Sequence, residues 1–329
     1  MQAPTERRAP LAQEHLISHL GARRVALAAA ALLMDLTSLA VRRLPPAARE
    51  RLAGAAAVPW LWLWRRRLPV IAQNFAVVLG QAPAGTGPLD PQAYALARES
   101  LRSYARMAID FLVVRTMQES EVLAWVQPVG VQHLQEALGD RKGVIFVLPH
   151  LGSWDVAAAF AHAYGCRLTI VVERGWMAEL AAGSRLARGA TLVPREGSLR
   201  ALFRALARQE IVVLLTDVIG PGVATIEVPF FGRPAPFPIG PARLSQRTGA
   251  PILVISCVRL PDGRYRIEAQ PPLRPDPALP PSEAVYRLTA AIAAGFERAI
   301  ATAPAQWYPF HPIWPDRAAG VFDGGDRHV

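Results

Sequence analysis

Cysteine and lysine are nearly missing from this chain. Its 329 residues include two cysteines, Cys166 and Cys257, which lie far apart and outside any CxxC spacing, and the single lysine Lys142 among 36 basic residues. Two isolated cysteines exclude a disulfide framework and a cysteine-based zinc site, and they fit a reducing compartment. The preference for arginine, with abundant alanine and proline, indicates codon bias and not function.

Several enzyme fingerprints are also missing. The sequence contains no GxSxG, GxGxxG, Walker A loop or HExxH, so the usual hydrolase, dinucleotide-binding, NTPase and metalloprotease interpretations are removed. No metal site and no cofactor are predicted. Three histidines are interpreted as structural, because no residue near them in the sequence has the spacing of a catalytic or metal-binding partner. They are His133, His162 and His311.

A third absence is a long apolar run. The apolar fraction is 52% and the mean hydropathy +0.20, yet no stretch reaches the ~18–20 uninterrupted apolar residues of a spanning helix. The nearest, residues 25–41, holds Asp35 between arginine pairs, so an interfacial or buried helix is predicted. Residues 52–64 run into three arginines, which fits an interfacial anchor or, equally, a helix end packed on the core.

Positive charge gathers at the N-terminus. The first 75 residues hold eleven arginines and four acidic residues, and so carry +7 of the net charge of +10. Basic residues beside apolar segments favour anionic lipid headgroups, at roughly 1 kcal/mol per charge near the surface. The basic residues interleave with Leu, Ala and Trp, and no nucleic-acid module is recognised. An anionic membrane surface is therefore the predicted partner, and nucleic acid is not.

The order of the expected elements predicts an α/β fold. From Gly143 onward, strand-like apolar runs alternate with helical stretches, which favours a mostly parallel central sheet flanked by helices, with one or two antiparallel edge strands. A Gly/Pro-rich linker covers residues 81–91. The expected domains are a helical membrane-associating region at 1–75, an α/β domain at 76–317 and a flexible tail at 318–329.

Individual elements follow from the periodicity. Strands are expected at 144–148, 168–172, 192–193, 211–215, 252–258 and 265–269, the last behind a Pro-Asp-Gly turn. Helices are expected at 92–112, about 154–164, about 178–187, 199–206 and 285–300, with 122–138 partly helical. The Pro/Gly-rich stretch 220–240 is expected to form a loop over the site. Phe230, Phe231 and Phe237 would either line an acyl-chain groove or simply pack under the loop.

The most informative segment is FVLPHLGSWD, residues 146–155. A buried strand ends just before His150, and Asp155 falls in the first turn of the next helix. An imidazole can take the proton of an attacking hydroxyl near neutral pH, and a carboxylate at its other nitrogen would fix the tautomer. In the alternative interpretation Ser153 caps the helix, Asp155 complements its dipole, and His150 is an ordinary loop histidine. Asp217 ends a neighbouring strand at the same sheet edge, as a supporting acid or simply as the start of a turn.

Six sequence blocks together resemble the bacterial family that contains the late lipid A acyltransferases and the phosphatidylinositol mannoside acyltransferases. The resemblance covers residues 74–315. The blocks are HLGSWD at 150–155, VVER at 171–174, LTD at 215–217, IEVPFFG at 226–232, RTGAP at 247–251 and QWYPFH at 306–311. After His311 the chain reads IWPD where many members have basic residues, so contacts of the tail do not carry over.

The resemblance implies roles for individual residues. The family's H-x4-D motif implies that His150 is the general base and Asp155 its carboxylate. Glu227 matches a glutamate of the mannoside branch that is thought to pair with the histidine. Glu173 and Arg188 align with charged residues that shape the acceptor site, with an edge carboxylate and an exposed helix arginine as the alternatives. Independently of the resemblance, Arg174 could bind a phosphate, and Asp217 is grouped with these residues as substrate-binding because of its place at the sheet edge.

The function implied is that of a membrane-associated O-acyltransferase, acting at the cytoplasmic face of the bacterial inner membrane as a peripheral or monotopic protein. It would move a fatty acyl group from acyl-CoA to a hydroxyl of a glycolipid, in the manner of a phosphatidylinositol mannoside acyltransferase. One alternative is a lipid A acyltransferase of the lauroyl or myristoyl type that uses acyl carrier protein or acyl-CoA. Another is a non-catalytic lipid-binding protein.

Overall fold

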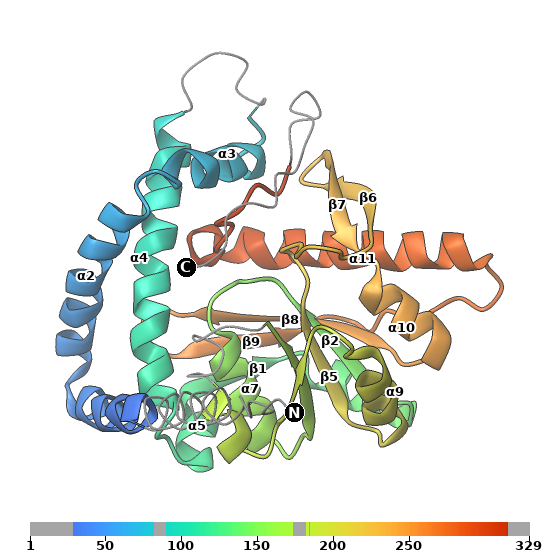
Figure 1. The fold of residues 1–329 in the computed structure, drawn as a ribbon, viewed down its shortest axis with the longest axis horizontal. Helices are drawn as coiled ribbons and strands as arrows, with labels where there is room; N and C mark the ends of the chain where they lie inside the picture. Colours follow the sequence, from blue (N-terminus) through green and yellow to red (C-terminus); the bar gives the residue numbers. More distant parts are fainter. Residues whose placement is uncertain (1–28, 82–89, 174–181, 184, 315–329) are drawn as a thin grey trace, which may run out of the picture.

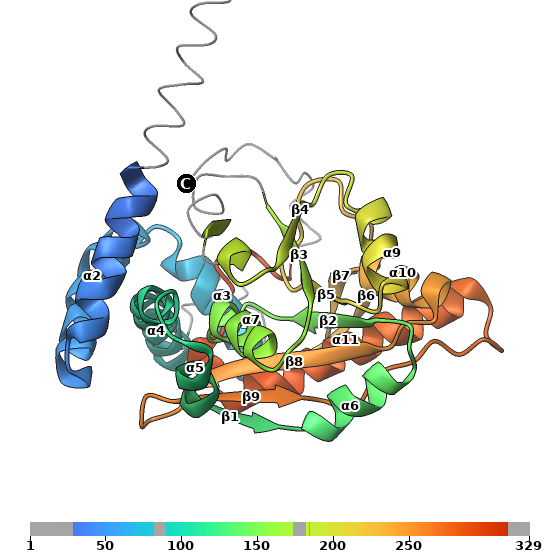
Figure 2. The same ribbon diagram turned by 90° about the horizontal axis from the view of Figure 1, so that it is seen from below.

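The computed structural model describes residues 29–81, 90–173, 182–183 and 185–314. It is an α/β fold built on a seven-stranded sheet of order β1-β9-β8-β2-β5-β3-β4, with helices on both faces (Figures 1 and 2). The strands are β1 (Val126–Val129), β2 (Val144–Leu148), β3 (Leu168–Val172), β4 (Thr191–Pro194), β5 (Ile211–Leu215), β8 (Ile252–Arg259) and β9 (Tyr265–Ala269).

Most neighbouring strands run parallel. β2 pairs in parallel with β8 and β5, β5 with β3, and β3 with β4. β9 is antiparallel to β8, and β1 is parallel to β9, so the two strands at one edge run against the rest. The predicted mostly parallel sheet with antiparallel edge strands is therefore confirmed, although β1 lies inside a segment that was expected to be partly helical.

Helices account for most of the remaining described chain. Residues 29–43 are helical. The later helices are α2 (Pro46–Leu63), α3 (Leu68–Val78), α4 (Pro91–Val114), α5 (Glu119–Trp125), α6 (Val131–Gly139), α7 (Trp154–Ala163), α9 (Leu199–Ala207), α10 (Gly240–Thr248), α11 (Pro281–Thr302) and the short 3-10 helix η1 (Pro304–Gln306). Of the helix expected at about 178–187, residues 182–183 and 185–187 are helical, whereas residues 178–181 and 184 lie outside the described residues, as do residues 1–28 and the tail at 318–329.

Every side chain of β2 is buried, because the strand sits in the middle of the sheet between two hydrophobic layers. Ile145 and Val147 pack with α3, α4, α9, α10 and α11, whereas Val144, Phe146 and Leu148 pack with α6 and α7. A run of five apolar residues is thus explained by burial on both faces, as expected for a parallel sheet covered by helices. The end of β2 is thereby fixed in space.

The N-terminal helices lie beside the sheet. α2 packs along α4 (Figure 1). Ile71 and Phe75 of α3 belong to the hydrophobic layer that also contains Ile145 and Val147 of β2. The expected domain boundary between residues 75 and 76 falls within α3, and the three-part division stays a prediction. No helix of the described chain is both long and apolar enough to cross a bilayer.

The expected loop at 220–240 was wrong for most of its length. Residues 225–238 form a two-stranded antiparallel hairpin, β6 (Thr225–Phe230) and β7 (Arg233–Pro238), which packs against α11 (Figure 1). The turn residues Phe231 and Gly232 both have positive φ, 49° and 72°, as a two-residue hairpin turn requires. Phenylalanine is rare at such a position, so the usual turn pattern did not reveal it. Phe230 and Phe237 are buried in the core, against Trp314 and Phe296.

Candidate active site

The loop between β2 and α7 is held by close backbone contacts. Gly152 has φ +63°, and a Cβ there would lie 1.8 Å from the carbonyl oxygen of Cys257 on β8. The next residue, Ser153, donates its backbone N–H to that same carbonyl oxygen at 3.0 Å, and its hydroxyl accepts from Val156 N at 3.3 Å to cap α7. The predicted Ser153 cap is confirmed, and the loop has little freedom to move.

His150 points its ring at Asp217. Nδ1 of His150 and Oδ1 of Asp217 are 2.6 Å apart, and the backbone N–H of His150 donates to Oδ2 at 2.8 Å. The two residues follow β2 and β5, which are neighbours in the sheet. The sequence predicted that Asp217 would lie at this edge. The structure makes it the direct partner of the imidazole.

Electrostatics favour an ionised Asp217. Its side chain is 1% exposed, and burial alone raises the pKa of the carboxyl. The charge of His150, its two hydrogen bonds and a third from the indole of Trp307 at 2.9 Å outweigh burial, so the pKa of Asp217 lies below its ordinary value. An ionised carboxylate accepts the Nδ1 proton of His150, and this tautomer leaves the lone pair on Nε2.

The face of the ring is partly open. The side chain of His150 is 28% exposed, and the ring meets Trp154 edge-on at 5.3 Å between centroids. Among the residues that the structure describes, hydrogen bonds to this ring involve Nδ1 alone. A neutral imidazole with Nδ1 anchored and Nε2 available can accept a proton from a nucleophile, which is the chemistry of a general base.

Asp155 does not meet the expectation that it would contact His150. It is buried in the first turn of α7, and Oδ1 accepts from Nε of Arg185 at 2.8 Å. The side chains of Asp155 and Arg185 are 9% and 14% exposed, so the pair is largely removed from water. The carboxylate five residues after the histidine is therefore paired with Arg185, while Asp217 accepts the hydrogen bond from the ring.

The remaining predicted residues lie in separate places. Glu227 is exposed on β6 opposite Pro236, and no described hydrogen bond joins it to His150. Exposed Glu173 forms an ion pair with Arg195 at 2.7 Å. Arg174 lies outside the described residues.

Arg188 is tied to the protein backbone. It donates to the carbonyl oxygens of Val114 at 2.7 Å and Met117 at 3.1 Å, at the end of α4. Burial lowers the pKa of its guanidinium, and the charge of Glu119 acts in the opposite direction. These contacts join the segment before β4 to α4, and the substrate-binding role stays a prediction.

Two residues of the site were missed by the sequence analysis. Arg185 gave no signal beyond the general rule that a buried carboxylate needs a cation. Trp307 belongs to the block QWYPFH that carried part of the resemblance, but nothing in the sequence placed its indole beside Asp217. Its role is visible only once the C-terminal segment is folded against the sheet.

Comparisons with known proteins agree on one family. A family model described as bacterial lipid A biosynthesis acyltransferase matches residues 23–315. The chain is 31% identical over 285 residues to a phosphatidylinositol mannoside acyltransferase of Mycolicibacterium smegmatis, which covers 83% of this chain and 88% of the relative. It is also 31% identical over 256 residues to a protein of the same name from Mycobacterium tuberculosis, covering 74% and 76%.

Proposed function

The chain belongs to the bacterial lipid A biosynthesis acyltransferase family, and from this premise we propose that it transfers a fatty acyl group from an acyl thioester to a hydroxyl of a membrane glycolipid. The observation that carries the proposal is the His150 ring, anchored at Nδ1 by Asp217 and partly exposed. Acyl-CoA is the proposed donor, and the mannoside relatives favour a phosphatidylinositol mannoside-like acceptor.

The proposed reaction needs one base and no cofactor beyond the two substrates. Nε2 of His150 removes the proton as the acceptor oxygen attacks the thioester carbonyl carbon, and a C–O bond forms. The tetrahedral intermediate then expels the thiolate as the C–S bond breaks. The proton passes from Nε2 to the sulfur, so the imidazole is regenerated. Asp217 stabilises the imidazolium between these two transfers.

Asp155 and Glu227 take supporting roles in this proposal. Asp155 acts through Arg185, with which it is paired. Glu227 projects from the β6–β7 hairpin, which lies on α11, and is proposed to contact the acceptor together with Glu173, Arg174 and Arg188. A contact with substrate predicts a change in KM for the acceptor, whereas a contact with His150 predicts a change in kcat.

The test is acyl transfer by the full chain in detergent, with palmitoyl-CoA and a phosphatidylinositol mannoside acceptor, and with products identified by mass spectrometry. We expect His150→Ala to lower kcat by about 10²–10⁴-fold. His133→Ala is the matched control, because His133 lies on α6, which precedes β2, and is paired with Glu136, so this variant should retain activity. Full turnover by His150→Ala would refute the proposed base.

A lipid A acceptor is the second candidate, favoured by the description of the matching family model. The same assay with a lipid A precursor, and with acyl carrier protein in place of CoA, separates the two. Transfer to the lipid A precursor alone would overturn the proposed acceptor. The base mechanism would remain intact, because either reaction removes a proton from a hydroxyl.

We also propose that the N-terminal helices rest on an anionic membrane surface. The helix at 29–43 and α2 expose large apolar side chains, including Leu32, Leu33, Leu36, Trp62 and Leu63. Arg65 lies over the ring of Trp62 at 4.4 Å. Apolar side chains interleaved with arginine are typical of an interfacial helix. From α2, ring contacts run through Trp60, Tyr104, Tyr308 and Trp154 to His150.

Vesicle flotation tests this surface. We expect the full chain to float with vesicles containing phosphatidylglycerol, and Arg65→Glu/Arg66→Glu to lower the membrane-binding constant by at least about 30-fold, at about 1 kcal/mol for each arginine charge lost. Arg200→Glu/Arg243→Glu is the control, because α9 and α10 lie at the end of the molecule opposite α2 (Figure 1). Equal loss of binding in both pairs would show that net charge alone, and not this surface, governs binding.

A further inference from the structure

The segment that follows η1 pairs with the loop that carries His150. The backbone N–H of Gly152 donates to the carbonyl oxygen of Gln306 at 2.9 Å, and the N–H of Tyr308 donates to the carbonyl oxygen of His150 at 2.9 Å. Leu151 and Trp307 form an isolated antiparallel bridge. The loop is thus held by β8 on one side and by residues 306–308, which we name the C-terminal strap, on the other.

The indole of Trp307 reaches the catalytic carboxylate from the strap. Trp307 is fully buried, and its Nε1 donates to Oδ2 of Asp217 at 2.9 Å. Asp217 accepts two further hydrogen bonds, both from His150. Trp307 is therefore the one described donor to this carboxylate that does not belong to the His–Asp pair itself.

Trp307 is itself held rigidly. Its ring contacts Phe75 at 6.0 Å, Phe230 at 6.1 Å and Trp314 at 6.5 Å between centroids. Its carbonyl oxygen accepts from the hydroxyl of Ser100 on α4. Trp307 is thus contacted by residues of α3, α4 and the hairpin and by Trp314.

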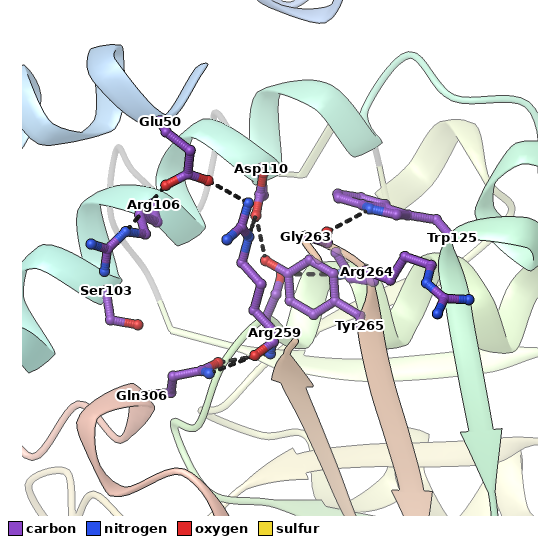
Figure 3. Close-up of polar contacts among 12 residues, drawn as sticks. Glu50, Ser103, Arg106, Asp110, Trp125, Arg259, Gly263, Arg264, Tyr265 and Gln306 are labelled. Carbon is purple, nitrogen blue, oxygen red and sulfur yellow. Dashed lines mark hydrogen bonds and ion pairs between the residues drawn. The ribbon is translucent and has the colours of Figure 1, made fainter. Parts of the chain in front are cut away.

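The preceding residue ties the strap to β8. The side chain of Gln306 accepts from the N–H of Arg259 at 2.7 Å and donates to the carbonyl oxygen of Arg259 at 2.8 Å (Figure 3). The guanidinium of Arg259 donates to Asp110 on α4 at 2.8 Å and forms an ion pair with Glu50 on α2. The strap is thereby connected to the N-terminal helices as well as to the sheet.

We infer that Trp307 is a positioning residue, whose indole N–H holds Asp217 in the rotamer that accepts the hydrogen bond from Nδ1–H of His150. A buried carboxylate bonded only to the residue that it orients could rotate about its χ angles together with that residue. A third donor from a rigid ring removes this freedom and distributes the negative charge over both oxygens. The inference rests on the proposed role of His150 as base, and it assigns a function to a residue that touches no substrate.

The direction in which loss of the Trp307 hydrogen bond changes proton uptake by His150 follows from the charges of the two partners. The indole hydrogen bond is stronger to a carboxylate that faces a neutral imidazole than to one already compensated by an imidazolium. Its loss therefore destabilises the neutral-imidazole form more, and proton uptake by the ring becomes easier. Other titratable or charged groups near the site are His311, Tyr308, Tyr104, Asp155 and Arg67. Burial, then Arg67 and His150, lower the pKa of His311.

The first test needs no acyl transfer. In 13C-histidine-labelled protein, we expect the titration midpoint of the His150 ring to move upward by about half a pH unit in Trp307→Phe. His150→Ala and His311→Gln assign the two neighbouring rings. Phe296→Leu is the control for lost core packing, because Phe296 is equally buried and its described ring contact is with Phe237. The midpoint of His150 should stay unchanged in this variant. An unmoved midpoint in Trp307→Phe, or an equal shift in Phe296→Leu, would overturn the inference.

A second measurement holds even where Trp307→Phe does not fold. Of the eight indole N–H signals, one should lie far downfield in the full chain and move upfield in Asp217→Asn, while the others hold. If no indole signal responds to Asp217→Asn, Trp307 does not act through that carboxylate. Neither NMR measurement requires an acyl acceptor. Both can therefore test the role of Trp307 even if the proposed acyl transfer is wrong.

A double-mutant cycle then tests whether Trp307 affects kcat through Asp217. Trp307→Phe should lower kcat roughly tenfold, the rate effect of about 1.4 kcal/mol, with KM for the donor unchanged. In the Asp217→Asn background the same substitution should have almost no further effect. Additive losses, or a change in KM alone, would assign Trp307 a purely structural role.

Discussion

Two aspartates differ in their partners: Asp155 lies in the first turn of α7, and Asp217 follows β5 beside the loop that carries His150. Asp217 receives hydrogen bonds from His150 and Trp307, whereas Asp155 is paired with Arg185. A carboxylate is suited to orient an imidazole only if its own charge is not already committed to a guanidinium. The division of tasks between the two aspartates therefore follows from their neighbours and not from their spacing to the histidine.

The buried Asp155–Arg185 pair makes a residue-level prediction. Arg185→Gln should lower the free energy of unfolding by about 3 kcal/mol, because it leaves a buried carboxylate without a cation. Asp155→Asn/Arg185→Gln should lose less than Arg185→Gln alone, since both charges are removed together. Urea denaturation of the single and double variants measures this. Strictly additive losses would mean that the two side chains contribute independently.

The sequence could predict where the histidine lies but not what it contacts. The buried run of β2 and the capping Ser153 are local features, and each is visible in consecutive residues. The partner of the ring depends on which strand lies beside β2, a contact between residues 67 positions apart. Asp155 was chosen because it is near in sequence, whereas the sheet brings Asp217 nearer in space.

At the scale of elements, the β2–α7 loop depends on one glycine. Gly152→Ala should cost more than about 3 kcal/mol of unfolding free energy and abolish acyl transfer, because a Cβ would collide with the Cys257 carbonyl and the backbone has positive φ. Gly165→Ala is the matched control, because Gly165 has φ +88° but open space around it. It should cost about 1 kcal/mol and leave activity intact. Comparable losses in both variants would contradict the argument from close approach.

Elements with regular periodicity were predicted well, and those defined by tertiary contacts were not. The runs at 144–148, 168–172 and 211–215 matched their strands because buried parallel strands are continuously apolar. The β6–β7 hairpin was expected as a loop, because it contains four prolines and a Phe-Gly turn that are unusual in strands and hairpins. Its strands are stabilised by packing on α11, which no local pattern displays.

At the scale of the whole molecule, Asp217 couples fold stability to pH. Its pKa is lower in the folded than in the unfolded chain, chiefly because the His150 charge and three hydrogen bonds outweigh burial. A lowered pKa contributes stability that is present above the unfolded value, about 3.9, and is lost as pH falls toward the folded value. The difference in unfolding free energy between the unsubstituted chain and Asp217→Asn should therefore shrink below about pH 4. Urea titrations at pH 6 and pH 3 compare them, and a constant difference would contradict the assignment.

The strap also has a consequence for how the protein is made. Asn74 on α3 binds the carbonyl oxygens of Pro309 and His311, each at 2.8 Å, and so secures the chain just beyond Trp307. His150 and Asp217 are synthesised before the strap. Their arrangement is completed only when the strap has left the ribosome and has docked on the sheet. A nascent chain that has not yet reached residue 307 therefore lacks the indole donor to Asp217, and the carboxylate gains this hydrogen bond only after the strap has been synthesised and has docked.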